Sequence, residues 1–325
     1  MHTRTFTGRN LFDFGYLLEA RRGAHFADLS PDEVIALFER HGALLFRGFS
    51  LEPSNVLDAV NLYSHTLLRM DAPRRRDALG TGGTSVLTDY PGLPIPLHSE
   101  NSYFFQQYWP EIVWLYCERP PEHEGHTLLC DGALAWNELD PGLRKQFLEK
   151  RLVYRLCVPK ELLEYGINAD DGEGNIRAAV EHMARGTPGV RHWFDDARNL
   201  HAEVKRHGVT LGRDGRTWAF ANHVCSYMEP AIEDEIRFED GMPIAPRAMQ
   251  QIRNATDRHT RKVEWVAGDL LMIDNHRVLH GRTAYDPACE RRLISAMTLT
   301  ANFAYGQSFR VAISRRSARN NHDRP

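Results

Sequence analysis

A chain of 325 residues with 42% hydrophobic side chains can bury a sizeable core, as one large domain or as two smaller ones. Its formal net charge of −3 and its short basic runs, such as Arg74 to Arg76, argue against a nucleic-acid-binding surface. The sequence has no signal-peptide pattern at its start, no apolar run near the ~18 residues that cross a membrane, and five scattered cysteines without a CxxC pair. We therefore expect a reduced, cytoplasmic protein without a disulfide framework.

The first predicted elements are a helix, a strand and a second helix. Ser30 to Glu33 combines a hydroxyl cap, a proline at the first helical position and a carboxylate three residues after the cap, which predicts a helix start. Gly42 ends this helix, and residues 43–46 form a short apolar run that is typical of a buried strand. A second helix is predicted over residues 54–67. Residues 71–96 are rich in Gly, Pro, Thr and Arg and predict a long loop.

The remaining chain holds short strand-like runs that are bounded by turn residues. They cover residues 112–117, 127–130, 152–158, 217–220, 270–273 and 293–299. Because these runs show no regular βαβ alternation, they predict a mainly β fold, a sandwich or jelly-roll barrel with flanking helices. Helices predicted over residues 195–206 and 246–257 are expected as insertions that cover the barrel. Residues 315–325 have almost no apolar side chains and predict a disordered tail, which leaves 1–314 as one domain.

Two histidines are followed two residues later by a glutamate, about the number that chance produces in this composition. The pair His201-Ala-Glu203 lies in a predicted helix, where positions i and i+2 point ~200° apart and cannot easily chelate one ion. The pair His98-Ser-Glu100 follows an extended run, and in a strand positions i and i+2 face the same side. His98 and Glu100 are therefore candidate metal ligands.

His280 is the candidate third ligand, because it follows the apolar run 270–273 and precedes Gly281 at an expected strand edge. Two imidazoles and one carboxylate leave three positions open on an octahedral ion, the arrangement of non-haem Fe(II) oxygenases. The same ligands also suit catalytic Zn²⁺, so a hydrolase or lyase stays open at this point. Arg291 opens the next strand, eleven residues on, and its planar guanidinium suits a dicarboxylic cosubstrate.

Five motifs occur in a fixed order along the chain. They are His98-Ser-Glu100, Gly125-His-Thr127, Asp274-Asn-His-Arg277, His280-Gly-Arg282 and Arg291 to Met297. This series resembles that of the TauD/TfdA superfamily, whose members are Fe(II)- and 2-oxoglutarate-dependent oxygenases on a double-stranded β-helix. The resemblance covers roughly residues 46–301 and is closest to the SyrP-like branch of natural-product biosynthesis, with which the chain shares Glu100 and Trp109-Pro110.

The resemblance implies a ligand set and a cosubstrate site. The implied Fe(II) ligands are His98, Glu100 and His280, and the implied contacts to the distal carboxylate of 2-oxoglutarate are Thr127 and Arg291. Arg292 is the alternative anchor, because adjacent residues of a strand face opposite sides. Glu100 stands where most members have Asp, and a halogenating relative has a small residue there, so Glu100 argues against halogenation.

The resemblance also implies a reaction. Fe(II), 2-oxoglutarate and O₂ would together hydroxylate an unactivated C–H bond of an amino acid or an amino-acid-derived substrate, free or tethered to a carrier protein. Desaturation, epoxidation or cyclisation are alternative outcomes, since substrate placement decides among them. A hydrolase would not need the arginine anchor, and a jelly roll that only binds small molecules would hold metal without turnover. The sequence leaves the substrate and the oligomeric state open.

Further residues near the motifs are candidates for supporting roles. Asp274 and Arg277 are expected either to support the metal ligands or to shape the turn before them. Asn101, Tyr103 and Asn222 fall on segments that are expected near the pocket.

Overall fold

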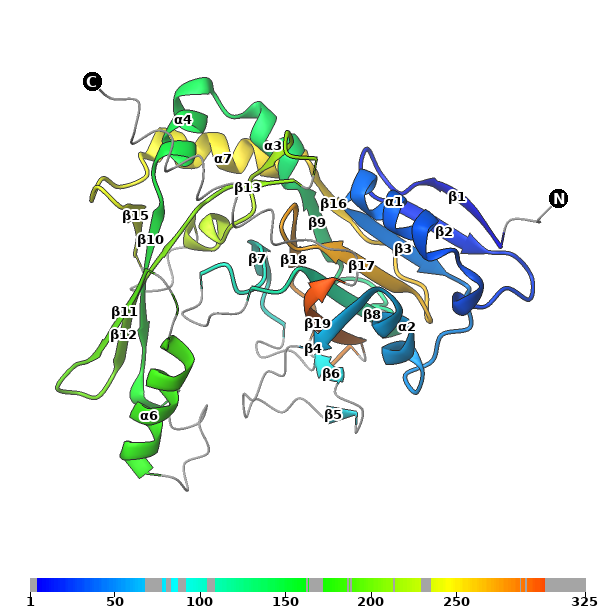
Figure 1. Cartoon of the computed structure of the whole chain (residues 1–325), viewed down its shortest axis with the longest axis horizontal. Helices are drawn as coiled ribbons and strands as arrows, with labels where there is room; N and C mark the ends of the chain where they lie inside the picture. The colour runs from blue at the N-terminus through cyan, green and yellow to red at the C-terminus, as the bar shows by residue number, and fades with distance from the viewer. Residues whose placement is uncertain are drawn as a thin grey trace.

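The computed structural model has two β-sheets that face each other across an apolar core (Figure 1). It describes residues 5–67, 78–79, 83–86, 92–103, 109–161, 163, 172–185, 187, 189–212, 214–228, 235–286, 288–289 and 291–301. The predicted tail 315–325 lies outside these residues, as does Arg74.

The larger sheet has the strand order β1-β2-β3-β17-β8-β19-β6-β5, and β4 also pairs with β19. Its strands are β1 (Phe6–Asn10), β2 (Tyr16–Ala20), β3 (Ala43–Arg47), β4 (Ser64–Leu67), β5 (Ala78–Leu79), β6 (Gly83–Val86), β8 (Ile112–Arg119), β17 (Leu270–Asp274) and β19 (Arg292–Ala301). The predicted runs 43–46, 112–117, 270–273 and 293–299 thus form the centre of this sheet.

The smaller sheet has the order β16-β9-β18-β7 and carries the candidate metal ligands. Its strands are β7 (Ile95–His98), β9 (Thr127–Asp131), β16 (Thr260–Lys262) and β18 (Val278–Arg282). All of its pairs are antiparallel. Side chains on alternate residues therefore point either at the larger sheet or away from it.

The inner faces of the two sheets meet in one apolar cluster. Leu45, Val113 and Ile273 of the larger sheet pack there with Leu129 and Val278 of the smaller sheet. Two packed sheets with apolar inner faces are the sandwich that the strand pattern predicts. The jelly-roll prediction is confirmed.

Helices cover the outer faces of both sheets (Figure 1). They are α1 (Pro31–His41), α2 (Val56–Tyr63), α3 (Gly132–Glu138), α4 (Pro141–Glu149), α6 (Gly172–Ala184), α7 (Pro246–Arg258) and the short 3₁₀ helices η1 (Phe26–Asp28) and η3 (Val224–Met228). From α1 and α2, Phe38 and Val60 pack with Trp114 of the larger sheet. The predicted boundaries of α1 are confirmed, since Ser30 caps its start and Gly42 ends it with a left-handed φ of 72°.

A third sheet covers the smaller one on its outer side, together with α3, α4 and α7. It contains β10 (Leu152–Val158), β11 (Val190–Phe194), β12 (Leu200–Arg206) and β15 (Glu235–Phe238). Between β12 and β15 in the chain, β13 (Thr210–Leu211) and β14 (Trp218–Ala219) form a separate two-stranded sheet. Tyr154 and Val204 of this sheet share a core with Leu279 and Cys130 of the smaller sheet. Figure 1 shows β10 to β12 on the side opposite α1, with α6 near their far end.

Two helix predictions are wrong. Residues 200–206 form strand β12, not a helix, because β10 and β11 pair with both of its edges and bury Leu200, Ala202 and Val204 on one face. The second helix ends at Tyr63, because the chain from Ser64 pairs with β19 instead.

The predicted loop over residues 71–96 is also wrong in part. Its described residues include β5, β6 and the first residues of β7. Such two- to four-residue strands carry too few side chains to show a period. In the described part of the chain, no helix has the length and apolar character that a membrane crossing requires.

Candidate metal centre

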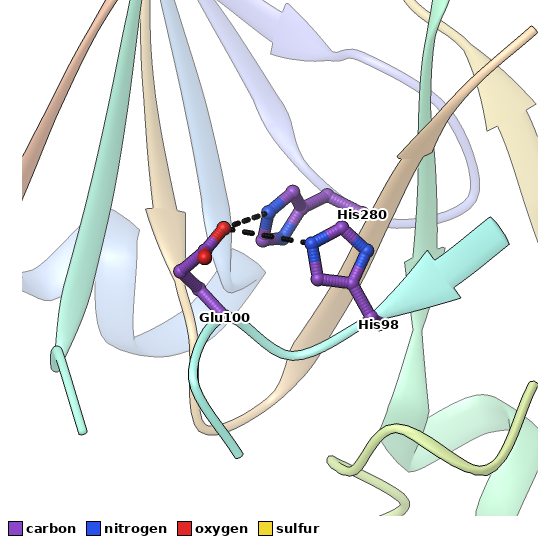
Figure 2. Close-up of side chains that lie close together, drawn as sticks. All are labelled: His98, Glu100 and His280. Atoms are coloured by element: carbon purple, nitrogen blue, oxygen red, sulfur yellow. Dashed lines mark ion pairs between the residues drawn. The ribbon is translucent and has the colours of Figure 1, made fainter. Parts of the chain in front are cut away.

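Two histidines face each other across neighbouring strands. His98 ends β7 and lies directly opposite His280 of β18 in the antiparallel register. Their ring centroids are 4.4 Å apart. Because opposed residues of an antiparallel pair have Cβ atoms only ~5 Å apart, this pairing alone directs both imidazoles at one point (Figure 2).

Glu100 completes a cluster of three ligands in the loop after β7. Its Oε2 lies 3.5 Å from Nε2 of His98 and 3.4 Å from Nε2 of His280 (Figure 2), and the ligand atoms of all three residues lie within 4.8 Å of one another. Two ligand atoms held ~2.1 Å from one ion at right or tetrahedral angles lie roughly 3.0–3.4 Å apart. The spacing and the donor set therefore fit a single metal ion.

A buried asparagine that the sequence analysis passed over holds the Glu100 loop. Glu100 donates its backbone N–H to Oδ1 of Asn275 at 2.7 Å, and Nδ2 of Asn275 donates to the carbonyls of Glu100 at 3.0 Å and Pro110 at 2.8 Å. Ser99 adds a hydroxyl bond to the Asn275 carbonyl at 2.7 Å. The side chain and backbone of one fully buried residue thus fix the loop that presents the carboxylate.

The neighbours of Asn275 in the motif shape the turn between β17 and β18. Arg277 forms an ion pair with Asp131 at 2.6 Å and donates to the carbonyl of Arg40 at the end of α1. Asp274 accepts the backbone N–H of His276 at 3.0 Å. Of the two roles expected for Asp274 and Arg277, these contacts are those of turn shaping.

The pKa shifts of Glu100 and His280 suit metal binding, whereas the shift of His98 means that a metal must displace a proton there. Burial alone would raise the pKa of Glu100, but hydrogen bonds from both imidazoles outweigh it and hold that pKa well below the usual value. Burial and the neighbouring His98 lower the pKa of His280. Burial also opposes charge on His98, but the Glu100 carboxylate outweighs it and raises the pKa of His98. A metal needs the carboxylate ionised and both imidazoles neutral.

The backbone selects which nitrogen of His98 faces the cluster. Nδ1 of His98 lies 2.9 Å from the carbonyl of Pro96, which has no proton to give, so Nδ1 carries the proton and donates. In the neutral imidazole the lone pair is then on Nε2, the atom that faces Glu100. Hydrogen bonds of this kind orient metal-binding histidines.

A further histidine packs beside the cluster. His223 stacks on Tyr103 with ring centroids 3.9 Å apart and meets the ring of His98 edge-on at 5.2 Å. Burial, and then the charge of His98, holds the pKa of His223 well below the usual value, so the imidazole is neutral. Asn222, expected near the pocket, accepts the backbone N–H of Ser99 at its carbonyl, and its side-chain amide bonds to Gly208 and to the N–H of Val224.

A buried tryptophan orients the hydroxyl of Thr127. Nε1 of Trp265 donates to Oγ1 of Thr127 at 3.0 Å, and both residues are buried. A hydroxyl that accepts this bond keeps its own proton to donate. Thr127 is therefore suited to donate to an anion between the sheets.

The two candidate arginines differ in what they contact. Arg292 forms an ion pair with Glu118 at 2.9 Å, and its side chain is 40% exposed. Nε of Arg291 is buried and has no hydrogen-bond partner in the described residues, and burial, followed by the charge of Arg282, lowers the pKa of Arg291 to about 10. A guanidinium whose buried Nε has no partner among the described residues fits the carboxylate of a cosubstrate.

The second His-x-Glu pair was set aside for the wrong reason. His201 and Glu203 lie on strand β12, so they share a face as His98 and Glu100 would in a strand. His201 is instead paired with Asp195 at 2.9 Å, and Glu203 receives Arg155 at 2.8 Å. These partners, not a helical geometry, occupy both side chains.

Comparison with known proteins gives relatives over most of the chain. The dapdiamide synthesis protein DdaC of Enterobacter agglomerans is 22% identical over 80% of this chain and 85% of the relative. The 3-((Z)-2-isocyanoethenyl)-1H-indole synthase of Fischerella ambigua is 24% identical over 89% of this chain and 93% of the relative.

Solved structures share the fold. PvcB of Pseudomonas aeruginosa has a TM-score of 0.56 at 18% identity and covers 93% of this chain and 94% of its own. A second PvcB structure, with a TM-score of 0.54, is that of an Fe- and α-ketoglutarate-dependent oxygenase from an isonitrile synthetic pathway. At these identities the likeness shows the double-stranded β-helix fold alone.

The family itself is shown by sequence. The family model described as "Taurine catabolism dioxygenase TauD, TfdA family" matches residues 11–297, which include every motif named above. The chain therefore belongs to the TauD/TfdA family and is an Fe(II)- and 2-oxoglutarate-dependent dioxygenase.

Proposed function

We propose that this dioxygenase hydroxylates an unactivated C–H bond of an amino acid or an amino-acid-derived small molecule, free or bound to a carrier protein, in natural-product metabolism. Support comes from the relatives, whose names place them in dapdiamide synthesis and in isonitrile chemistry. A cytoplasmic location fits the five free cysteines.

In this proposal His98, Glu100 and His280 would hold Fe(II), and a site with three protein ligands would leave room for cosubstrate and substrate. Bound Fe(II) with 2-oxoglutarate and O₂ supplies the oxidising power for the C–H bond. Arg291 and Thr127 orient the distal carboxylate of 2-oxoglutarate. The apolar core between the sheets excludes water from these contacts and strengthens them.

One observation carries the proposed site: Thr127 lies opposite Arg282 of β18, two residues along the strand from the proposed metal ligand His280. Arg282, whose charge acts on Arg291, lies two residues beyond His280 on β18. That is ~7 Å along a strand, a separation that a five-carbon diacid can span. A hydrolase has no use for a second anchor at this place.

The test is a turnover assay with matched charge reversals. With Fe(II), 2-oxoglutarate and O₂, the wild type should form succinate faster when an accepted amino acid or carrier-bound aminoacyl group is added, and the product should gain one oxygen atom. Arg291→Glu should abolish this turnover, and Arg292→Glu should retain most of it.

Other outcomes would overturn parts of the proposal. Loss of two hydrogens from the product, without added oxygen, would replace hydroxylation by desaturation or cyclisation. Equal loss of turnover in both arginine variants would remove Arg291 from its proposed role.

A further inference from the structure

Strand pairing fixes the backbone of His98 but not the tilt of its imidazole. His98 is the last residue of β7, and after it the chain continues as the loop that carries Glu100. The hydrogen bond between Nδ1 and the carbonyl of Pro96 at 2.9 Å holds one edge of the ring. Rotation of a histidine ring about its Cβ–Cγ bond has broad energy wells. Contacts with neighbouring side chains therefore decide how far this ring can turn.

Two other imidazoles contact the ring of His98. The ring of His280 lies 4.4 Å away between centroids, at an interplanar angle of 50°. The ring of His223 lies 5.2 Å away at 70°, an edge-to-face arrangement. Among the described residues, the group that could hold a metal includes His280 but not His223. His223 thus contacts a proposed ligand without being one.

The ring of His223 also contacts the other end of the loop that carries Glu100. Tyr103 stacks on it, with centroids 3.9 Å apart and an interplanar angle of 25°. Stacked and edge-to-face pairs are the arrangements that aromatic rings prefer. Through His98 and Tyr103, His223 therefore contacts the chain on both sides of Glu100.

The backbone around His223 is itself fixed. The N–H of His223 donates to Oη of Tyr154 at 3.3 Å, and Tyr154 is a fully buried residue of β10 in the third sheet. The carbonyl of the preceding residue, Asn222, accepts the N–H of Ser99 at 2.9 Å. The imidazole of His223 thus extends from a backbone that is bound to the third sheet and to the ligand loop.

We propose that His223 is a positioning residue of the metal centre, and that its ring, stacked on Tyr103, holds the imidazole of His98 at the tilt that directs Nε2 at the ion. This inference rests on the metal site of the proposed function. The role requires a flat ring at position 223 and not a nitrogen atom, so a phenylalanine should serve there. If His223 only filled the core, its loss would change stability and leave the metal centre as it is.

The experiment loads metal-free protein with one metal at a time, without oxygen. The visible bands of bound Co(II) report the arrangement of its ligands, and competition with a coloured chelator gives the Fe(II) affinity. The variants are His223→Ala, His223→Phe, Tyr103→Ala and Tyr103→Phe. His201→Ala is the matched control, because it removes another histidine ring that stacks on an aromatic side chain, Trp193, at 5.4 Å. His98→Ala tests the site itself, and urea unfolding of each metal-free variant gives its stability.

His223→Ala should weaken Fe(II) roughly three- to tenfold, the size expected when one ring contact is lost, and should shift the Co(II) bands. His223→Phe should keep the affinity and the bands of the wild type. Tyr103→Ala should act in the same direction as His223→Ala but more weakly, and Tyr103→Phe should resemble the wild type. His201→Ala should change neither readout.

Three results would overturn the inference. Wild-type affinity and bands in His223→Ala would remove His223 from the metal centre, and reduced stability with unchanged bands would leave it as core packing only. If His223→Phe is as weak as His223→Ala, the ring is not what matters. A wild type that binds neither metal, or Co(II) bands that survive in His98→Ala, would instead overturn the proposed metal site.

Discussion

The side-chain amide of Asn275 forms two hydrogen bonds with the backbone of Glu100. It accepts the Glu100 N–H at 2.7 Å and donates to the Glu100 carbonyl at 3.0 Å. His98 and His280 are fixed by strand pairing, but Glu100 lies outside any strand. Asn275 therefore fixes the position of this loop residue, as strand pairing fixes the two histidines.

Asn275→Ala should loosen Glu100 and lower the affinity for Fe(II) about 10- to 100-fold, as is usual when a partner behind a metal ligand is removed. An anaerobic titration against a coloured chelator measures this affinity. Asn222→Ala is the matched control, since it removes another buried amide that bonds to Gly208 and Val224. Equal iron affinity in both variants would contradict the role of Asn275.

Trp265→Phe should weaken 2-oxoglutarate roughly three- to tenfold, the worth of one neutral hydrogen bond. The substitution removes the donor that orients the Thr127 hydroxyl and should leave iron affinity unchanged. Trp114→Phe is the matched control. It removes the corresponding indole hydrogen bond, to Ser64 at 3.1 Å, in the core on the other side of the larger sheet. The prediction fails if both variants change the 2-oxoglutarate affinity equally.

Gly125→Ala should lower both stability and 2-oxoglutarate affinity. A left-handed alanine costs about 1–2 kcal/mol, and overpacking against Arg291 and Tyr285 adds about 1–3 kcal/mol. Gly241 has a φ of 86° with nothing within 4 Å of an added Cβ, so Gly241→Ala isolates the backbone cost. Urea unfolding, and an anaerobic titration of the Fe(II)-loaded protein with 2-oxoglutarate, should separate the two variants. Indistinguishable behaviour would argue against close packing of Gly125 against Arg291 and Tyr285.

Stability should depend on pH through Glu203. The hydrogen bond from Arg155, followed by the charges of Arg237 and Arg191, lowers the pKa of Glu203 despite its burial. A lowered pKa means that this stabilisation is present above the ordinary value of 4.5 and is lost as pH falls through the lower folded value.

Glu203→Gln should therefore cost about 1 kcal/mol at neutral pH, and the difference from wild type should shrink in acid. Urea unfolding across this pH range checks the sign. Glu149→Gln breaks only an exposed pair with Lys145 and should show no such trend. A difference for Glu203→Gln that persists in acid would mean that its charge is not responsible.

The elements that the sequence predicts well are those with strong local signals. Ser30 with Pro31 gives the start of α1, and residues 152–158 match strand β10. The sequence predicts a helix over strand β12, although Leu200, Ala202 and Val204 alternate with polar residues. Its local pattern was short, and the pairing with two neighbours that decides its structure comes from distant parts of the chain.

The candidate ligands could be predicted from the sequence, because their residue types and spacing identify them. The structure brings His98, Glu100 and His280 together, and iron binding by them stays a prediction. The hydrogen bonds that support this site could not be predicted, because their partners lie far apart in the sequence. Asn275 and Glu100 are 175 residues apart, and Trp265 and Thr127 are 138 residues apart. Only the folded chain shows such pairs.

The proposed function depends most on one metal site that binds Fe(II) and a keto acid together. Metal-free protein should be titrated without oxygen, first with Fe(II) and then with 2-oxoglutarate, while visible absorption is recorded. The wild type should show a weak charge-transfer band that is lost in His98→Ala and in Glu100→Ala. A wild type that binds iron without the band, or a band that survives both substitutions, would contradict the proposed function.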